Sequence, residues 1–178
     1  LLMGCGIAEN DDTYADMMRL KATDAYQVWD AGALNLLAGH PQQLGARAVI
    51  TPHAGEAARL LGWEIPAVLS DKLGAAEALR AKYGCNVVLK SAVPVMLTAD
   101  GQQCALNAVG SPALAKGGSG DALAGILASL LGQGLPMFDA MRAACLWLGL
   151  AGIAAGKRCG VRAALTGDVI DSLGACEG

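Results

Sequence analysis

Short apolar runs alternate with helical patterns along the first half of the chain. The apolar runs, which end at glycine, proline or a polar residue, predict strands over residues 1–3, 26–29, 48–50 and 86–90. The segments between them predict helices over residues 13–21, 33–38, 55–61 and 71–83, the last two ended by Gly62 and Gly84. Strands that alternate with helices indicate a parallel sheet covered by helices.

The second half of the chain breaks this rhythm. Residues 95–98 and 104–106 flank Ala99-Asp100-Gly101, and an Asp-Gly pair between two apolar runs predicts an antiparallel hairpin. Two long helices follow over residues 119–131 and 136–155. They are too apolar to expose more than a narrow stripe, so we expect them in a core or an interface. Without a linker or an internal repeat, residues 1–178 are expected to form one domain.

Composition supports a folded chain and suggests that part of its surface is covered. Apolar residues make up 54% of the 178 residues and charged residues 16%, which argues against a disordered chain. An ordinary soluble domain carries about 25% charged residues. We therefore expect either a homo-oligomer or a missing segment to cover the apolar surface.

Charge and residue usage exclude several classes of function. The net charge is −3 and no basic run is present, so nucleic-acid binding is not expected. The longest run of small and apolar residues, 143–156, is shorter than the roughly 20 residues that span a bilayer, and we expect a buried helix instead. The six cysteines form no C-x-x-C pair and the chain has two histidines, so no metal site is expected. The chain does not begin with Met, and residues 1–3 have no basic leader of the kind that a signal peptide carries. We therefore expect a cytoplasmic protein with reduced thiols.

The most informative segment is Lys116-Gly117-Gly118-Ser119-Gly120-Asp121, at the start of an apolar helix. Glycines allow a ligand to approach the backbone, and the free amides and positive dipole end of a helix attract anions such as phosphate. Asp121 would then be placed to take a proton from an attacking hydroxyl. The alternative is an ordinary glycine turn in which Asp121 favours the helix dipole, and the pattern alone leaves both open.

The other candidates each follow a predicted strand. Parallel strands place their carboxyl ends at one edge of the sheet, where open α/β folds bind ligands. Each candidate alone also has an ordinary interpretation, as a loop histidine, a helix-start glutamate or a surface lysine. These candidates are Gly4-Cys5-Gly6, Asp30, His53 and Glu56 in Thr51-Pro52-His53-Ala54-Gly55-Glu56, and Lys90.

Taken together and in this order, these motifs resemble the ADP/ATP-dependent NAD(P)H-hydrate dehydratase family. The resemblance covers nearly the whole chain. It includes Val28 to Asn35, Val87 to Lys90, Lys116 to Gly125 and a last helix at Leu165 to Ile170. It implies a ribokinase-like fold, a three-layer α/β/α domain with a mostly parallel sheet and one antiparallel hairpin. It also implies a lyase that uses ADP or ATP to remove water from hydrated NADH or NADPH (NADHX or NADPHX), through phosphorylation of the hydrate hydroxyl and loss of phosphate.

The resemblance also implies roles for individual residues. Asp121 corresponds to the catalytic base and to a contact with the hydrate. Mg²⁺ is expected to accompany the nucleotide phosphates. Gly118, Ser119 and Gly120 correspond to the anion hole. Gly4, Gly6 and His53 correspond to contacts with the hydrate. The segment that lines the nucleotide corresponds to Lys90, Ser91, Ala92, Val93 and Pro94, with Gly120 nearby.

The chain also departs from the family pattern. Lys90-Ser91-Ala92-Val93-Pro94 stands where the family has Lys-Gly-x-x-Thr, and the family's domain has about a third of its length before the Gly4 turn. Two alternatives follow, a ribokinase-like kinase of a vitamin precursor and a catalytically silent nucleotide-binding protein. The Thr51 to Glu56 motif favours the dehydratase over the kinase.

Overall fold

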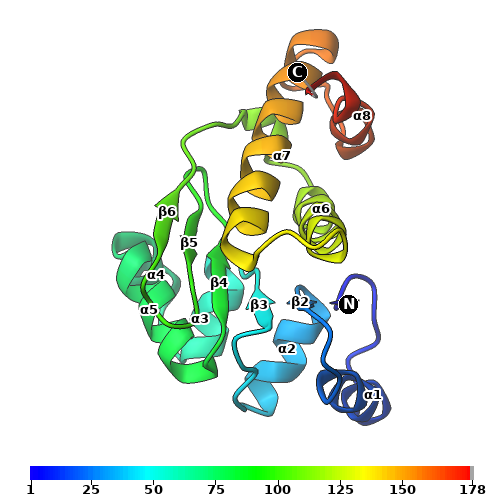
Figure 1. Ribbon diagram of the computed structural model, residues 1–178. Helices are drawn as coiled ribbons and strands as arrows, with labels where there is room; N and C mark the ends of the chain where they lie inside the picture. Colours follow the sequence, from blue (N-terminus) through cyan, green and yellow to red (C-terminus); the bar gives the residue numbers. More distant parts are fainter. Residues whose placement is uncertain (177–178) are drawn as a thin grey trace.

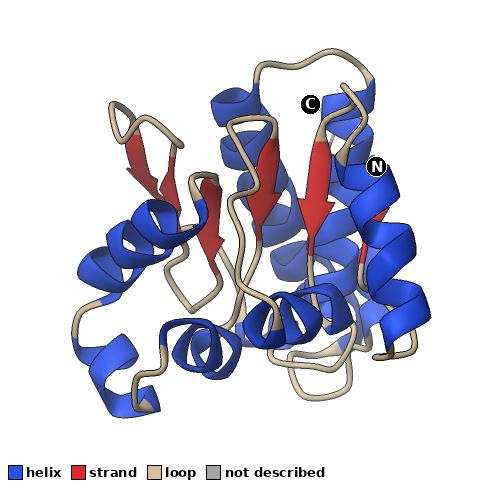
Figure 2. Ribbon diagram, turned by 90° about the horizontal axis from the view of Figure 1, so that it is seen from below, coloured by secondary structure: helices blue, strands red, loops and turns tan. Residues whose placement is uncertain are grey.

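The computed structural model describes residues 1–176 and contains one six-stranded sheet in the order β1-β2-β3-β4-β5-β6. The first four strands are parallel, and β5 and β6 are antiparallel to their neighbours. Figure 2 shows the strands side by side with helices around them. The strands are β1 (Leu2–Met3), β2 (Gln27–Trp29), β3 (Ala48–Ile50), β4 (Asn86–Leu89), β5 (Val95–Leu97) and β6 (Cys104–Leu106).

Helices cover both faces of the sheet (Figure 1). One layer contains α1 (Asp11–Lys21), α2 (Gly32–Gly39), α3 (Ala54–Leu61), α4 (Ile65–Ser70) and α5 (Lys72–Tyr83). The other contains α6 (Ser119–Gly132), α7 (Met137–Cys159) and α8 (Thr166–Asp171), and short 3-10 turns form at Pro112–Leu114 and Gly174–Cys176. The chain therefore has the expected three-layer α/β/α fold.

Alternation of side chains along the strands divides the core in two. Trp29, Ile50 and Val87 pack in the cluster with α1 to α5, whereas their neighbours Val28 and Val49 pack with α6 and α7. Successive side chains of a strand point to opposite faces of a sheet. Every residue of β2, β3 and β4 is buried, as a sheet covered on both faces requires.

The structure extends the sequence expectations in two places. The expected hairpin is present, but β5 also pairs antiparallel with β4, so residues 90–94 form a second tight connection. Helix α4 was missed because it has six residues, carries Pro66 in its first turn and is largely exposed. Too few of its positions are buried to produce a helical pattern.

Helix α7 is longer than the apolar run that predicted it. With 23 residues it is long and apolar enough to cross a membrane, and 44% of its apolar window is buried inside the fold. Its buried side chains belong to the same core cluster as those of α6. Packing in the second helical layer therefore accounts for its apolar character, as expected for a buried helix.

Candidate active site

The candidate residues meet at the edge of the sheet where the parallel strands end. Asp30 follows β2, Lys90 follows β4, and His53, three residues after β3, forms a parallel bridge with Lys90. The amino end of α6 reaches the same place, because a Cβ at Gly120 would lie 3.1 Å from Lys90 Nζ and 3.7 Å from Asp30 Oδ2. Residues separated by up to 90 positions thus share one site.

Lys90 is the centre of a charged network. Its Nζ donates to Asp30 Oδ1 at 2.6 Å and lies 3.7 Å from Glu56 Oε2. The Asp30 side chain is 1% exposed and that of Lys90 17% exposed. An ionised carboxylate is buried to this extent only when it is paired, so Lys90 compensates the charge of Asp30.

His53 begins α3 as part of a capping box. Its Nδ1 accepts from the amides of Gly55 and Glu56 at 3.0 and 3.3 Å, and Glu56 Oε2 accepts from the His53 amide at 2.8 Å. Because Nδ1 is an acceptor, the ring proton of neutral His53 is on Nε2. The His53 side chain is 59% exposed, with Nε2 3.5 Å from Glu56 Oε1, so part of the ring is accessible to a ligand.

The turn before α6 leaves backbone amides free. Gly118 adopts a φ of +88° at the N-cap, where no side chain caps the helix. Among residues 1–176, the amides of Gly118, Gly120 and Asp121 have no hydrogen-bond acceptor. The Ser119 amide differs, because it donates to Lys116 O at 3.3 Å. Two of the three predicted anion-hole residues therefore offer a free amide.

The outer side of this turn is held by the segment after α7. Thr166 Oγ1 donates to Gly117 O at 2.8 Å, and Lys116 Nζ donates to Arg162 O at 2.9 Å. The Lys116 ammonium is thereby engaged by the backbone carbonyl of Arg162. The Ser119 hydroxyl is buried without a hydrogen-bond partner in the described part of the chain. The turn is not blocked by its own charged side chain.

Asp121 lies in the first turn of α6 and is exposed. Its carboxylate, that of Asp30 and the Cys5 sulfur lie within 4.8 Å of one another. Burial, followed by hydrogen bonding to Asp121 and the negative charges of Asp121 and Asp30, raises the pKa of the Cys5 thiol to about 11. Cys5 thus remains a neutral thiol at physiological pH.

The connection from Lys90 to Pro94 is the least open part of the site. Ser91 Oγ donates to Val93 O at 2.5 Å and also accepts from the Val93 amide. The Lys90 amide donates to Pro52 O at 2.8 Å, and Pro94 has no N–H to offer. The Ser91 hydroxyl and the Lys90 amide are therefore already engaged within the protein.

The two glycines after β1 differ in their surroundings. A Cβ on Gly4, which has a φ of +124°, would lie 1.6 Å from Asp30 O, whereas a Cβ on Gly6 would meet nothing within 4 Å. Gly4 is required for the close approach of β1 to the backbone of Asp30. This packing role was not apparent from the sequence.

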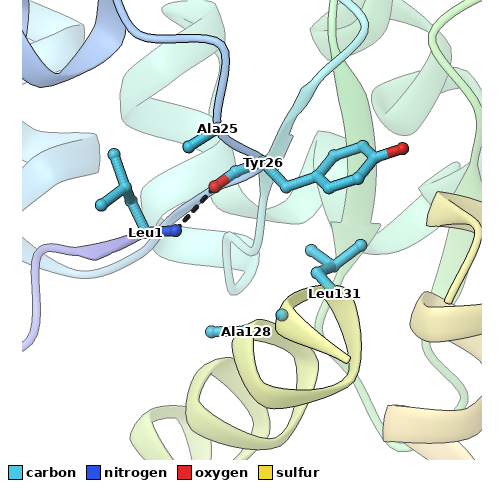
Figure 3. A pocket seen from close by; sticks show the side chains of 6 residues that line it. Leu1, Ala25, Tyr26, Ala128 and Leu131 are labelled. Carbon is cyan, nitrogen blue, oxygen red and sulfur yellow. Dashed lines mark hydrogen bonds between the residues drawn. The ribbon is translucent and has the colours of Figure 1, made fainter. Parts of the chain in front are cut away.

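The two described cavities lie at the opposite edge of the sheet. One, of about 140 Å³, is lined by Leu1, Tyr26 and the end of α6, and there the Leu1 backbone nitrogen donates to Tyr26 O at 2.7 Å (Figure 3). The other, of about 360 Å³, lies between the hairpin and the start of α7. The candidate site lies in neither of these cavities.

Comparison with known proteins supplies the family. A family model described as NAD(P)H-hydrate dehydratase matches residues 1–174. A bifunctional NAD(P)H-hydrate repair enzyme from Vibrio cholerae is 41% identical over 148 residues, which are 83% of this chain and 29% of the relative. An ADP-dependent (S)-NAD(P)H-hydrate dehydratase from Neisseria meningitidis is 37% identical over 161 residues, 86% of this chain and 53% of the relative.

Solved structures show the same fold. The ADP/ATP-dependent NAD(P)H-hydrate dehydratase from Bacillus subtilis, co-crystallized with ATP/Mg²⁺, matches with a TM-score of 0.86 and 25% identity. The match covers 98% of this chain and 62% of that one. The chain therefore spans about a third to a half of the curated relatives, and about three fifths of this solved relative.

Proposed function

Since this chain belongs to the NAD(P)H-hydrate dehydratase family, we propose that it is a nucleotide-dependent lyase that converts NADHX or NADPHX to NADH or NADPH. The observation that carries the proposal is the position of Asp121. Asp121 lies in the first turn of α6, where the amides of Gly118 and Gly120 are free, and its carboxylate lies within 4.8 Å of that of Asp30, the partner of the Lys90 ammonium. A proton acceptor beside an anion site is what phosphorylation of a hydroxyl requires.

The proposed reaction has two steps. In the first step, Asp121 takes the proton of the hydrate hydroxyl while the hydroxyl oxygen attacks the terminal phosphoryl group of the nucleotide. The phosphorus–oxygen bond between that group and the rest of the nucleotide breaks. The free amides of Gly118 and Gly120, in the anion hole with Ser119, stabilise the phosphoryl oxygens. The original carbon–oxygen bond of the phosphorylated hydroxyl then breaks, phosphate leaves with that oxygen, and loss of a proton from the neighbouring ring carbon restores the double bond.

The remaining residues divide between the two ligands. We assign His53, through the exposed part of its ring, and the Gly4 to Gly6 turn to the hydrate. The segment Lys90, Ser91, Ala92, Val93 and Pro94 is assigned to the nucleotide with Gly120. Because the Ser91 hydroxyl and the Lys90 amide are engaged internally, this segment would contribute mainly through the Lys90 ammonium.

Mg²⁺ fits this site as an ion brought by the nucleotide. Mg²⁺ binds through one or two carboxylates together with substrate phosphates. Asp30 and Asp121 supply such carboxylates, but Asp30 is paired with Lys90 and the third neighbour, Cys5, is a thiol that Mg²⁺ does not favour. The nucleotide phosphates would therefore supply most of the ligands of the ion, which would neutralise their charge.

We further propose that residues 1–178 belong to one ribokinase-like domain, and that the protein is a cytoplasmic homo-oligomer. Exposed Leu146 and Leu150, one turn apart on α7, together with exposed Leu106 on the edge strand β6, support an interface between copies. Apolar surface of this kind favours association.

The function is tested by incubating the purified chain with NADHX, Mg²⁺ and either ADP or ATP. We expect the absorbance of reduced nicotinamide to rise only when a nucleotide is present, with one phosphate released per NADH. The control reactions omit the nucleotide or replace NADHX by a thiazole or pyrimidine vitamin precursor. Phosphorylation of the precursor without recovery of NADH would favour the kinase alternative and contradict the proposal.

A further inference from the structure

The Lys90 ammonium is held by carboxylates from two other elements. Asp30 follows β2 and Glu56 lies in the first turn of α3, and their oxygens are 2.6 and 3.7 Å from Nζ. Both carboxylates are nearly buried, with side chains 1% and 9% exposed. A lysine side chain is otherwise flexible, and fixing it has an entropic cost. Because Asp30 and Glu56 lie on separate elements, their two contacts restrict the ammonium to one position.

That position is against the amino end of α6. A Cβ at position 120 would lie 3.1 Å from Nζ, so the ammonium would have to shift by a few tenths of an ångström to accommodate a larger residue than glycine. The ammonium therefore lies beside the positive end of the helix dipole and the free amides of Gly120 and Asp121. The ammonium is thus paired with Asp30 and at the same time lies at the end of the helix that favours anions.

Stability gives little reason for this arrangement. A buried ion pair recovers at most part of its desolvation cost, and well-packed apolar residues often do as well. Glu56 is also occupied by the His53 amide, so it has a capping role without Lys90. The Asp30–Lys90 pair is better explained as a means of positioning the Lys90 ammonium.

We propose that Asp30 is a positioning residue which, with Glu56, fixes the Lys90 ammonium against the start of α6, where it meets the transferred phosphoryl group. The inference rests on the proposed function, because it assumes that the anion at α6 is that group. Asp30 contacts neither substrate and acts through Lys90. Misplacing a charged group by about 1 Å can cost roughly 100-fold in rate.

A double-mutant cycle tests this role. Asp30→Asn and Lys90→Met are each expected to lower kcat/KM by about 100-fold, and the double variant is expected to be no worse than Lys90→Met alone. Asp16→Asn is the matched control, because Asp16 also forms a short pair, with Arg19 at 2.8 Å, but on the exposed surface of α1. It should retain wild-type activity. Losses that multiply in the double variant would contradict the proposal.

Amine labelling separates this role from the proposed function. Lys90 of the wild-type chain should react slowly with an amine-acylating reagent, more slowly still with ADP and Mg²⁺, and several-fold faster in the Asp30→Asn variant. Equal labelling of Lys90 in the wild type and the variant would overturn the positioning role, whatever the turnover. If the chain does not convert NADHX but ADP protects Lys90 in the wild type and not in the variant, the proposed reaction fails and the positioning of Lys90 against a phosphate stands.

Discussion

Replacing Asp121 by asparagine is expected to lower the turnover of NADHX by about 10²- to 10⁴-fold, the usual contribution of a general base. The amide has the size of the carboxylate but cannot accept the hydroxyl proton. Asp121 is exposed in the first turn of α6, so the exchange should leave the core intact. The effect is predicted on kcat, with little change in KM for the nucleotide.

The matched control for this variant is Asp139→Asn. Asp139 also lies in the first turn of a helix, α7, and is exposed, but it lines the cavity at the opposite edge of the sheet. Steady-state kinetics of both variants should show a loss for Asp121→Asn alone. Wild-type turnover by Asp121→Asn would show that another group takes the proton.

The largest effect on stability is expected from Gly4→Ala. Its Cβ would lie 1.6 Å from Asp30 O, and the backbone φ of +124° is unfavourable for alanine. Backbone strain and overpacking together should cost roughly 2–4 kcal/mol in the free energy of unfolding. The variant should also lose activity, because relief of the clash requires Asp30 to move.

Gly6→Ala provides the comparison in the same turn. Gly6 has a φ of +70°, and its Cβ would meet nothing within 4 Å, so only the left-handed conformation is penalised, by about 1–2 kcal/mol. Urea unfolding of both variants measures the difference. Equal losses in the free energy of unfolding would mean that the contact with Asp30 is not what requires glycine at position 4.

Local patterns predicted most of the fold. The strands at Ala48–Ile50 and Cys104–Leu106 are confirmed with the expected bounds, since each is a short apolar run between turn residues. Helix α4 and the pairing of β5 with β4 were missed. Helix α4 has too few buried positions to produce a helical pattern. The pairing of β5 with β4 depends on how tightly residues 90–94 turn, and the hydrophobic pattern of the sequence carries no information about that.

The site was predicted less completely. Placing Asp30, His53 and Lys90 at one edge followed from strand ends in a parallel sheet, and the structure brings them together. Three features could not be predicted, because they depend on contacts between side chains or backbone atoms of elements far apart in the sequence. They are the pairing of Asp30 with Lys90, the proximity of Cys5 to Asp121 and the hydrogen bond from Thr166 to Gly117. The roles in binding hydrate and nucleotide stay predictions.

The most direct test of the account follows one oxygen atom. NADHX carrying oxygen-18 in its ring hydroxyl is incubated with the chain, Mg²⁺ and nucleotide, and the released phosphate is analysed by mass spectrometry. If Asp121 activates that hydroxyl to attack the phosphoryl group, the label appears in inorganic phosphate. Label recovered in water, with unlabelled phosphate, would contradict phosphoryl transfer at the α6 turn.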